Sequence, residues 1–215
     1  MQGAFRELLF PCNCAGCGAA GYRLCAHCAI HLRQPPQRIS AKIYSHIPLW
    51  SLGAYGGARR KIIIATKERN RRDMIAPLGA MLASAVSYLI AQGEVEEDIV
   101  LVPAPTSRRS ALKRGGDPVT RVCQRTPFPV AKLIEHRAGV RDSVGLSMRQ
   151  RHTNMIGAVV PTPAAVRLHT AGGLSGFSVL LIDDILTTGA TLAASTAVLS
   201  AMGVKIRGGL AWAHA

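Results

Sequence analysis

The sequence predicts an α/β protein in which helices flank a parallel β-sheet and a small cysteine-rich module precedes the sheet. Short apolar runs of strand length alternate with helix-length segments, as in parallel sheets with helical crossovers. Five of the six cysteines lie between Cys12 and Cys28, and 48% of the 215 residues are hydrophobic, enough for a substantial core. We therefore expect a cysteine module over residues 1–36 and an α/β domain over residues 40–215.

The cysteine module carries two close pairs with seven residues between them, Cys14-x2-Cys17 and Cys25-x2-Cys28. Each pair can present two thiolates to one tetrahedral ion, and the intervening glycines permit tight turns. Because disulfides do not persist in a reducing compartment, we favour a structural Zn²⁺ site. Its expected ligands are Cys14, Cys17, Cys25 and Cys28. The alternatives are Cys12 in place of one of these, a histidine ligand at His27 or His31, or a redox pair.

A stiff break at Gln34-Pro35-Pro36-Gln37 separates the module from the α/β domain. The first long element expected in that domain is a helix over residues 73–92, capped by Asp73 and ended by Gly93. Because Pro77 lies near its beginning, we expect the first turn to be irregular.

The later elements follow from short apolar runs and their boundaries. Apolar runs at residues 98–103 and 178–182 predict buried strands, and further strands are expected over residues 130–134 and 204–212. Helices are expected over residues 118–125 and 190–202, the second ended by Gly203. Residues 137–154 are charged and aperiodic, and a loop of this length inside a compact domain is typical of a lid or binding loop.

Positive charge is concentrated in two stretches of the chain. The formal net charge is +14, from 26 Lys and Arg against 12 Asp and Glu. Residues 59–72 and 108–151 together hold the whole excess. An anionic partner is therefore expected, either a multiply phosphorylated small molecule or nucleic acid. Few aromatic residues interleave with these charges, which favours small phosphates over single-stranded nucleic acid.

The expected location is the cytoplasm. The longest mainly apolar stretch covers residues 78–91, which is shorter than the ~20 residues that a membrane-spanning helix needs. Arg6 and Glu7 interrupt what would have to be the apolar region of a signal peptide. We therefore expect neither membrane insertion nor secretion.

The sharpest chemical motif follows the strand expected at residues 178–182. The strand delivers Asp183 and Asp184 to the carboxyl edge of the sheet, where ligands of open α/β folds bind. A threonine-rich turn, residues 187–191, then opens a helix, and its N–H groups, hydroxyls and positive helix end suit a phosphate. Acids beside a phosphate site suit a ribose 5-phosphate, and an aspartate pair that only caps a helix is the alternative.

This segment resembles the phosphoribosyl pyrophosphate (PRPP) signature of type I phosphoribosyltransferases. The two cysteine pairs and residues 55–69, 102–115 and 142–154 are similar to the ComF family, which couples a zinc-binding N-terminus to a phosphoribosyltransferase fold. The resemblance implies a type I phosphoribosyltransferase fold that binds PRPP with Mg²⁺ and transfers the phosphoribosyl group to an unknown acceptor. It also implies an alternative, a non-catalytic accessory of competence and DNA uptake that binds single-stranded DNA or a recombination partner.

The resemblance also implies residue roles. Asp183 and Asp184 would hold the ribose hydroxyls, while Arg149 and Arg151, in the lid of residues 137–154, would face the pyrophosphate. The 5-phosphate site would comprise Thr187, Thr188, Gly189, Ala190 and Thr191. The pyrophosphate loop would comprise Pro105, Thr106, Ser107 and Arg108. The chain departs from the family at Gly115-Gly116-Asp117, which lacks the aromatic or histidine side chain often found there.

Overall fold

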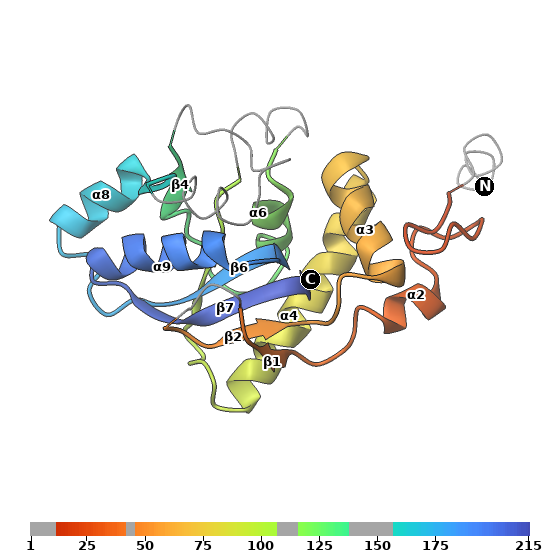
Figure 1. Cartoon of the computed structure of the whole chain (residues 1–215), viewed down its shortest axis with the longest axis horizontal. Coiled ribbons are helices and arrows are strands. Elements are labelled where there is room, and N and C mark those ends of the chain that lie inside the picture. Colours follow the sequence, from red (N-terminus) through yellow and green to blue (C-terminus); the bar gives the residue numbers. More distant parts are fainter. Residues whose placement is uncertain (1–11, 42–45, 107–115, 138–156) are drawn as a thin grey trace.

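A five-stranded sheet organises the protein (Figure 1). This computed structural model describes residues 12–41, 46–106, 116–137 and 157–215. The strand order is β1-β2-β7-β6-β3, and only the β1–β2 pair is antiparallel among these strands. The strands are β1 (Gln37–Ile39), β2 (Leu49–Ser51), β3 (Val100–Pro103), β6 (Ser178–Leu186) and β7 (Lys205–His214). The predicted α/β class with a mostly parallel sheet is confirmed.

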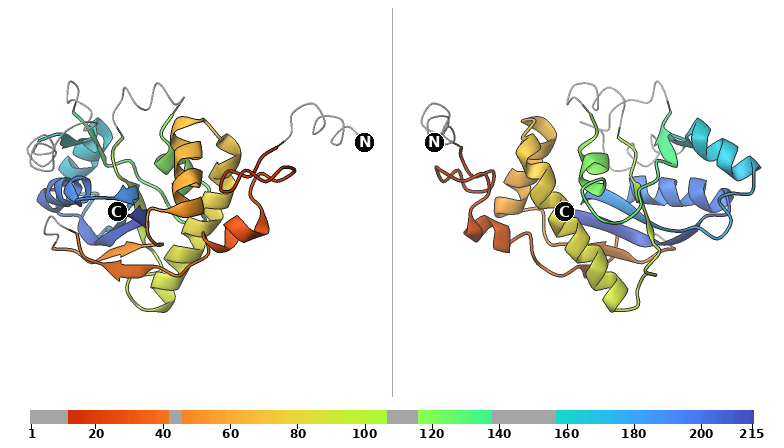
Figure 2. Two further views of the ribbon diagram at one scale, coloured as in Figure 1. Left: turned by 45° about the vertical axis from the view of Figure 1, so that its right-hand side comes forward. Right: turned by 180° about the vertical axis from the view of Figure 1, so that it is seen from behind.

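Helices cover both faces of this sheet, and α4 and α9 lie on opposite sides of it in Figures 1 and 2. A separate antiparallel pair, β4 (Ile134–His136) and β5 (Val159–Pro161), packs near α9. The helices are α2 (Ala26–Ile30), α3 (Gly57–Glu68), η1 (Arg72–Met74), α4 (Ile75–Ala91), α6 (Pro118–Cys123), α8 (Pro163–Thr170) and α9 (Ala190–Ala201).

The alternation of side chains along β6 explains the two-sided core. Leu180 and Ile182 belong to one buried cluster, with residues of α3, α4 and α6. Val179 and Leu181 belong to a second cluster, with residues of α9, β4 and β5. Because consecutive strand residues point to opposite faces, a strand covered on both sides needs an unbroken apolar run.

The cysteine module joins the first of these clusters. Cys14, Cys28 and Leu32 are buried together with residues of α3 and α4. β1 begins directly after the proline break, at Gln37. The division into domains over residues 1–36 and 40–215 stays a prediction.

The predicted helix over residues 73–92 begins differently from expectation. Its first turn is the 3₁₀ helix η1, and α4 proper starts at Ile75, so the predicted irregularity is confirmed. Asp73 is not the cap, because its carboxylate accepts two hydrogen bonds from the Arg71 guanidinium, at 2.8 and 2.7 Å. The helix ends before Gly93, as expected.

Two further expectations differ from the structure, and one helix was not expected. Val130 makes only an isolated bridge with Leu101, and the strand in this region, β4, begins at Ile134. The strand expected to end at Ile182 continues to Leu186, because its ladder with β7 runs on to the Leu186–His214 pair. Residues 57–68, which contain the first part of the basic stretch, form helix α3, and the sequence pattern did not predict this helix.

Among the described residues, one helical stretch, Arg72–Ala91, is long and apolar enough to cross a membrane by length and composition. Its side chains Leu78, Leu82, Val86 and Leu89 are fully buried in the first core cluster. A core helix of a folded domain passes the same test of length and composition. The cytoplasmic location stays a prediction.

Candidate functional site

Four cysteine side chains converge in the N-terminal module. The Sγ atoms of Cys14, Cys17, Cys25 and Cys28 all lie within 4.8 Å of one another. The Cys14–Cys25 and Cys17–Cys25 Sγ separations are both 3.7 Å. Four sulfurs arranged tetrahedrally at the usual Zn–S distance would lie about 3.8 Å apart. The four predicted residues can therefore hold one metal ion.

The alternative ligands lie outside this cluster. Within the described residues, the group that could hold a metal comprises the four cysteines and excludes Cys12. His27 and His31 contact each other edge to face, with ring centroids 5.3 Å apart, and are not part of the group.

The backbone of the module is folded tightly around the sulfurs. The Gly18 N–H donates to the Cys14 carbonyl (2.9 Å), and the Cys25 N–H donates to the Cys14 sulfur (3.4 Å). Cys25 also precedes α2, which carries Cys28. A Cβ atom at Gly16 would lie 2.6 Å from the Cys28 sulfur, so only glycine allows the chain to pass this close.

Backbone N–H groups that point at the sulfur favour a thiolate at Cys14. Burial alone would raise the pKa of this thiol, but backbone N–H donors, first that of Cys25, lower the pKa to about 6. Burial, followed by the neighbouring thiols, raises the pKa of Cys28. A cation at the centre would relieve the repulsion between these sulfurs, since metal ligation requires deprotonated thiols.

Two arginines fasten the cysteine module to the α/β domain. Arg59 is buried, and its guanidinium donates to the carbonyls of His31 in the module and Trp212 in β7. Burial lowers the pKa of Arg59. Arg71 binds Asp73 and donates to the carbonyls of Asn13 (3.0 Å) and Arg23 (3.4 Å). Part of the basic stretch is therefore structural.

The two predicted ribose-binding acids lie inside β6 and have different surroundings. Asp184 is buried, and its Oδ2 atom lies 2.6 Å from Nζ of Lys67, at the end of α3. Asp183 accepts a hydrogen bond from the Asp184 N–H (2.8 Å). Burial, and then the neighbouring Asp184 charge, raise the pKa of Asp183 to about 7, although Lys67 acts in the opposite direction. Asp183 is thus a carboxylate without adequate charge compensation.

The loop after β3 lies beside these acids. The Ala104 N–H donates to the Ile182 carbonyl (2.7 Å), so Pro105 and Thr106 follow β3 at the carboxyl edge of β6. The Thr106 hydroxyl donates to Asp117 (3.0 Å), which also caps α6 by accepting from the Val119 N–H (3.1 Å).

Asp117 and Lys67 were missed as site residues by sequence reasoning. An aspartate directly before Pro118 at the start of a helix is a capping signal, so Asp117 could have been found. Lys67 carries no such signal, because its partner Asp184 is 117 residues away in sequence and only the fold brings the two together.

A short turn connects β6 to α9. Thr187 is exposed, whereas Thr188 is buried and its hydroxyl oxygen accepts from the Ala190 N–H (3.3 Å). Gly189 occupies the cap position of α9 with φ 85°, a left-handed conformation that other residues rarely adopt. Thr191 lies in the first turn of α9.

The carboxyl edge of the sheet thus carries Asp183, Asp184, the turn of residues 187–189 and the start of the loop after β3. Ser107, Arg108, Arg149 and Arg151 lie outside the described residues, as does nearly all of the predicted lid over residues 137–154.

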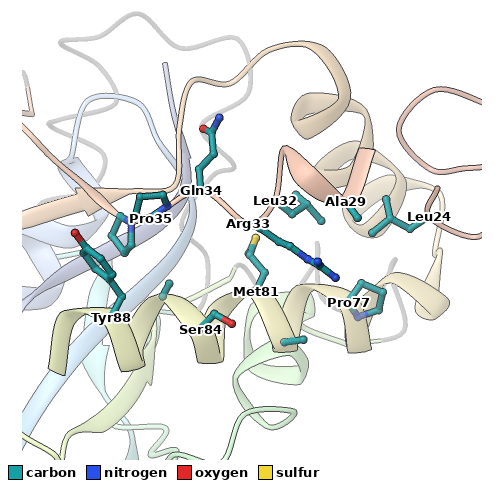
Figure 3. Close-up of a pocket in the computed structure, with 13 residues that line it drawn as sticks. Leu24, Ala29, Leu32, Arg33, Gln34, Pro35, Pro77, Met81, Ser84 and Tyr88 are labelled. Atoms are coloured by element: carbon teal, nitrogen blue, oxygen red, sulfur yellow. The ribbon is translucent and has the colours of Figure 1, made fainter. Parts of the chain in front are cut away.

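A well-formed cavity lies away from the sheet edge (Figure 3). It measures about 610 Å³ and lies between α4 and the chain that links α2 to β1. Leu32, Pro35, Met81 and Tyr88 give it a mainly apolar lining, and Arg33 is its charged residue. None of the predicted site residues lines this cavity, so it is separate from the candidate site at the sheet edge.

No family model matches the chain, and no curated protein matches it. Fold and site together define an α/β protein with a mostly parallel sheet and a four-cysteine cluster that could hold a metal. Its similarity to the ComF family stays a prediction that rests on the sequence motifs.

We predict that Asp183→Asn stabilises the protein at pH 8 by about 2 kcal/mol and has little effect at pH 4. The pKa in the folded state lies above that in the unfolded chain, so stability is lost as the pH rises from about 4 through 7. The asparagine carbonyl can still accept the Asp184 N–H. Urea denaturation at both pH values measures the difference.

The neighbouring substitution is the matched control. Asp184→Asn removes the partner of Lys67 and should destabilise the protein by about 1–3 kcal/mol at pH 8. If both asparagine variants shift the urea midpoint in the same direction, the distinct environments assigned to the two acids are wrong.

Proposed function

We propose that the carboxyl edge of the sheet binds a ribose 5-phosphate group, as PRPP with Mg²⁺, and that the protein is a type I phosphoribosyltransferase-like protein. The observation that carries this proposal is the continuous path from Asp183 and Asp184 through a glycine turn into α9. Ligands of open α/β sheets bind at this edge, and a helix N-terminus favours a phosphate.

Each part of the edge has a chemical role in this proposal. The N–H groups of Thr191 and Leu192 lie in the first turn of α9, where N–H groups have no acceptor within the helix, and with the Thr187 and Thr191 hydroxyls they can donate to phosphate oxygens. The Thr188 hydroxyl accepts from the Ala190 N–H and keeps its own proton for a ligand oxygen. The negative charge of Asp183 is poorly compensated, and a ribose hydroxyl that donates to it or a cation beside it would stabilise that charge.

The reaction we propose is displacement of pyrophosphate from C1 of the ribose by an acceptor nucleophile. The C1–O bond to pyrophosphate breaks and a bond from C1 to the acceptor forms, so no protein nucleophile is needed. Positive charge that develops on the ribose ring would be stabilised by the aspartates. When bound, Mg²⁺ supplies charge to the departing pyrophosphate.

We predict that Asp183→Asn weakens PRPP binding 10- to 150-fold, since a charge-assisted hydrogen bond is worth about 1.5–3 kcal/mol. The variant should fold at least as well as the parent protein. Asp98→Asn provides the control, because Asp98 is exposed before the opposite end of β3. Calorimetry with PRPP and Mg²⁺ measures the affinities, and a parent protein that gives no binding heat at millimolar PRPP would remove the transferase proposal.

We also propose that the four-cysteine cluster holds structural Zn²⁺. Four thiolates in a tetrahedral arrangement suit this ion, and a site closed by four protein ligands leaves no open position for catalysis. The metal would replace the large apolar core that a module of this size lacks.

We predict about one Zn²⁺ per purified chain, lost on Cys25→Ser because three ligands remain. The module should then be cleaved faster by protease. Cys12→Ser is the control, because Cys12 lies outside the cluster, and it should retain the metal. Elemental analysis decides between the ligand sets, and loss of zinc from Cys12→Ser but not from Cys25→Ser would show that the assignment is wrong.

A further inference from the structure

The cavity in Figure 3 opens to solvent as a groove, because Arg33 on one wall and Ser84 on the other are both exposed. Its volume of about 610 Å³ lies in the range of cavities that bind drug-sized ligands, which is room for a few side chains. Leu32 and Met81 are buried residues of its lining. The groove therefore offers an apolar surface to a segment that lies across it.

Helix α4 forms one wall of this groove and carries no charged residue. Its sequence from Ile75 to Ala91 contains no Asp, Glu, Lys, Arg or His. Helix faces that stay in water normally carry charged side chains, whereas a helix that is uncharged on every side is normally covered. The exposed face of α4 therefore has the composition of a face that packs against a further segment. Its exposed positions hold only alanine, serine and tyrosine: Ala76, Ala80, Ser84, Ser87, Tyr88 and Ala91.

Arg33 gives the groove a positive charge. It is the charged residue of the lining, and its guanidinium has no hydrogen bond or ion pair with another described residue. In Figure 3 its side chain extends from the linker towards Pro77. A guanidinium beside an apolar surface favours an apolar segment that also carries a carboxylate, because the two charges then form a charge-assisted hydrogen bond.

The segment that precedes the cysteine module has this composition. Residues 1–11 lie outside the described residues. Four of the six side chains from position 5 to position 10 are large and apolar, and Glu7 is the acidic residue of the segment. The apolar ones are Phe5, Leu8, Leu9 and Phe10.

The described chain starts close to the groove. The Arg71 guanidinium donates to the carbonyls of both Asn13 and Arg23, so the two segments lie side by side. Leu24, the next residue after Arg23, lines the groove. An extended chain spans up to about 3.5 Å per residue, so the five residues from Glu7 to Cys12 span up to about 17 Å. This reach lets residues 5–10 extend from Leu24 along the groove.

The charge of the protein disfavours a second copy as the occupant. Each chain carries a formal charge of +14, so two copies repel each other. A segment of the same chain adds no such repulsion. Its tether also gives it an effective concentration of about millimolar at the groove, so a few apolar contacts and one ion pair suffice to hold it.

We propose that residues 5–10 of this chain bind in the groove, with their apolar side chains against Leu32 and Met81 and with Glu7 paired to Arg33. The bound segment would cover the uncharged face of α4 and fasten the cysteine module to it, in addition to the contacts of Arg59 and Arg71. The proposal depends neither on PRPP binding at the sheet edge nor on the identity of the metal.

Limited proteolysis of the full chain, with the cleavage sites identified by mass spectrometry, tests the proposal. Chymotrypsin cleaves after phenylalanine and leucine. It should cut between residues 5 and 9 of the parent protein at least tenfold more slowly than it cuts a synthetic peptide of residues 1–13. Cleavage of the protein as fast as the peptide would overturn the proposal.

Two charges on the groove wall should release the segment. Ala80 and Ser84 are exposed, so the double variant Ala80→Glu, Ser84→Glu leaves the core intact, and it should raise the cleavage rate at least fivefold. The matched control is Ala76→Glu, Ser87→Glu, which adds the same charges to exposed positions of α4 outside the groove and should change the rate less than twofold. Equal effects of the two double variants would contradict the proposed site.

An exchange of charges tests the ion pair and remains decisive if the variant of α4 is unstable. Glu7→Arg and Arg33→Glu each place like charges together, so each alone should raise the cleavage rate two- to fivefold. The combined variant Glu7→Arg, Arg33→Glu should return to within twofold of the parent protein. Arg38→Glu, at an exposed position outside the groove, is the control and should have no effect. A combined variant cleaved faster than either single variant would refute the pairing.

Two other occupants would also overturn the proposal. Light scattering that shows a dimer, converted to a monomer by Ala80→Glu, Ser84→Glu, would assign the groove to a second copy of the chain. Cosedimentation of the parent protein with phosphatidylglycerol vesicles, lost in the same variant but kept in Ala76→Glu, Ser87→Glu, would assign it to a lipid surface. We expect a monomer in both variants and no difference between them in vesicle binding.

Discussion

The parallel pairing of β6 with β3 on one side and β7 on the other is the constraint on which the structure depends. A central strand covered by helices on both faces is apolar over most of its length. β6 is apolar from Val179 to Ile182, and its two acids come directly afterwards. Asp183 and Asp184 therefore interrupt the apolar pattern near the carboxyl end of the strand, since Leu186 beyond them belongs again to the second buried cluster. The turn into α9 then places helix N–H groups beside those acids.

Helix α3 and the turn after it connect the two candidate sites. Arg59 binds carbonyls in the cysteine module and in β7, and Arg71 binds two more carbonyls of the module. Lys67, between them in sequence, pairs with Asp184 at the sheet edge. The metal cluster and the sheet edge thus share one helix, so a displacement of α3 that disturbed one would also move side chains at the other.

Local patterns in the sequence predicted much of this arrangement. The cysteine spacing predicted the cluster, and the apolar runs predicted the parallel sheet and the helices that end before Gly93 and Gly203. The pattern could not reveal α3 as a partly buried helix, because its basic residues suggest a solvated segment. It also could not reveal the Lys67–Asp184 pair or the burial of Arg59, since both depend on contacts between distant segments. The extra length of β6 depends on its partner β7.

The burial of Arg59 has a consequence for how this chain can vary. Its planar guanidinium donates to two carbonyls on separate segments at once. The ammonium group of a lysine is compact and cannot present two donors with this spacing. Exposed basic positions such as Arg60 and Arg72 accept exchange of arginine for lysine with little structural effect. At position 59 the same exchange would leave a buried carbonyl without a donor. Substitutions that are equivalent in charge are therefore unequal within residues 59–72, and the exchange at position 59 is the one that costs a buried hydrogen bond.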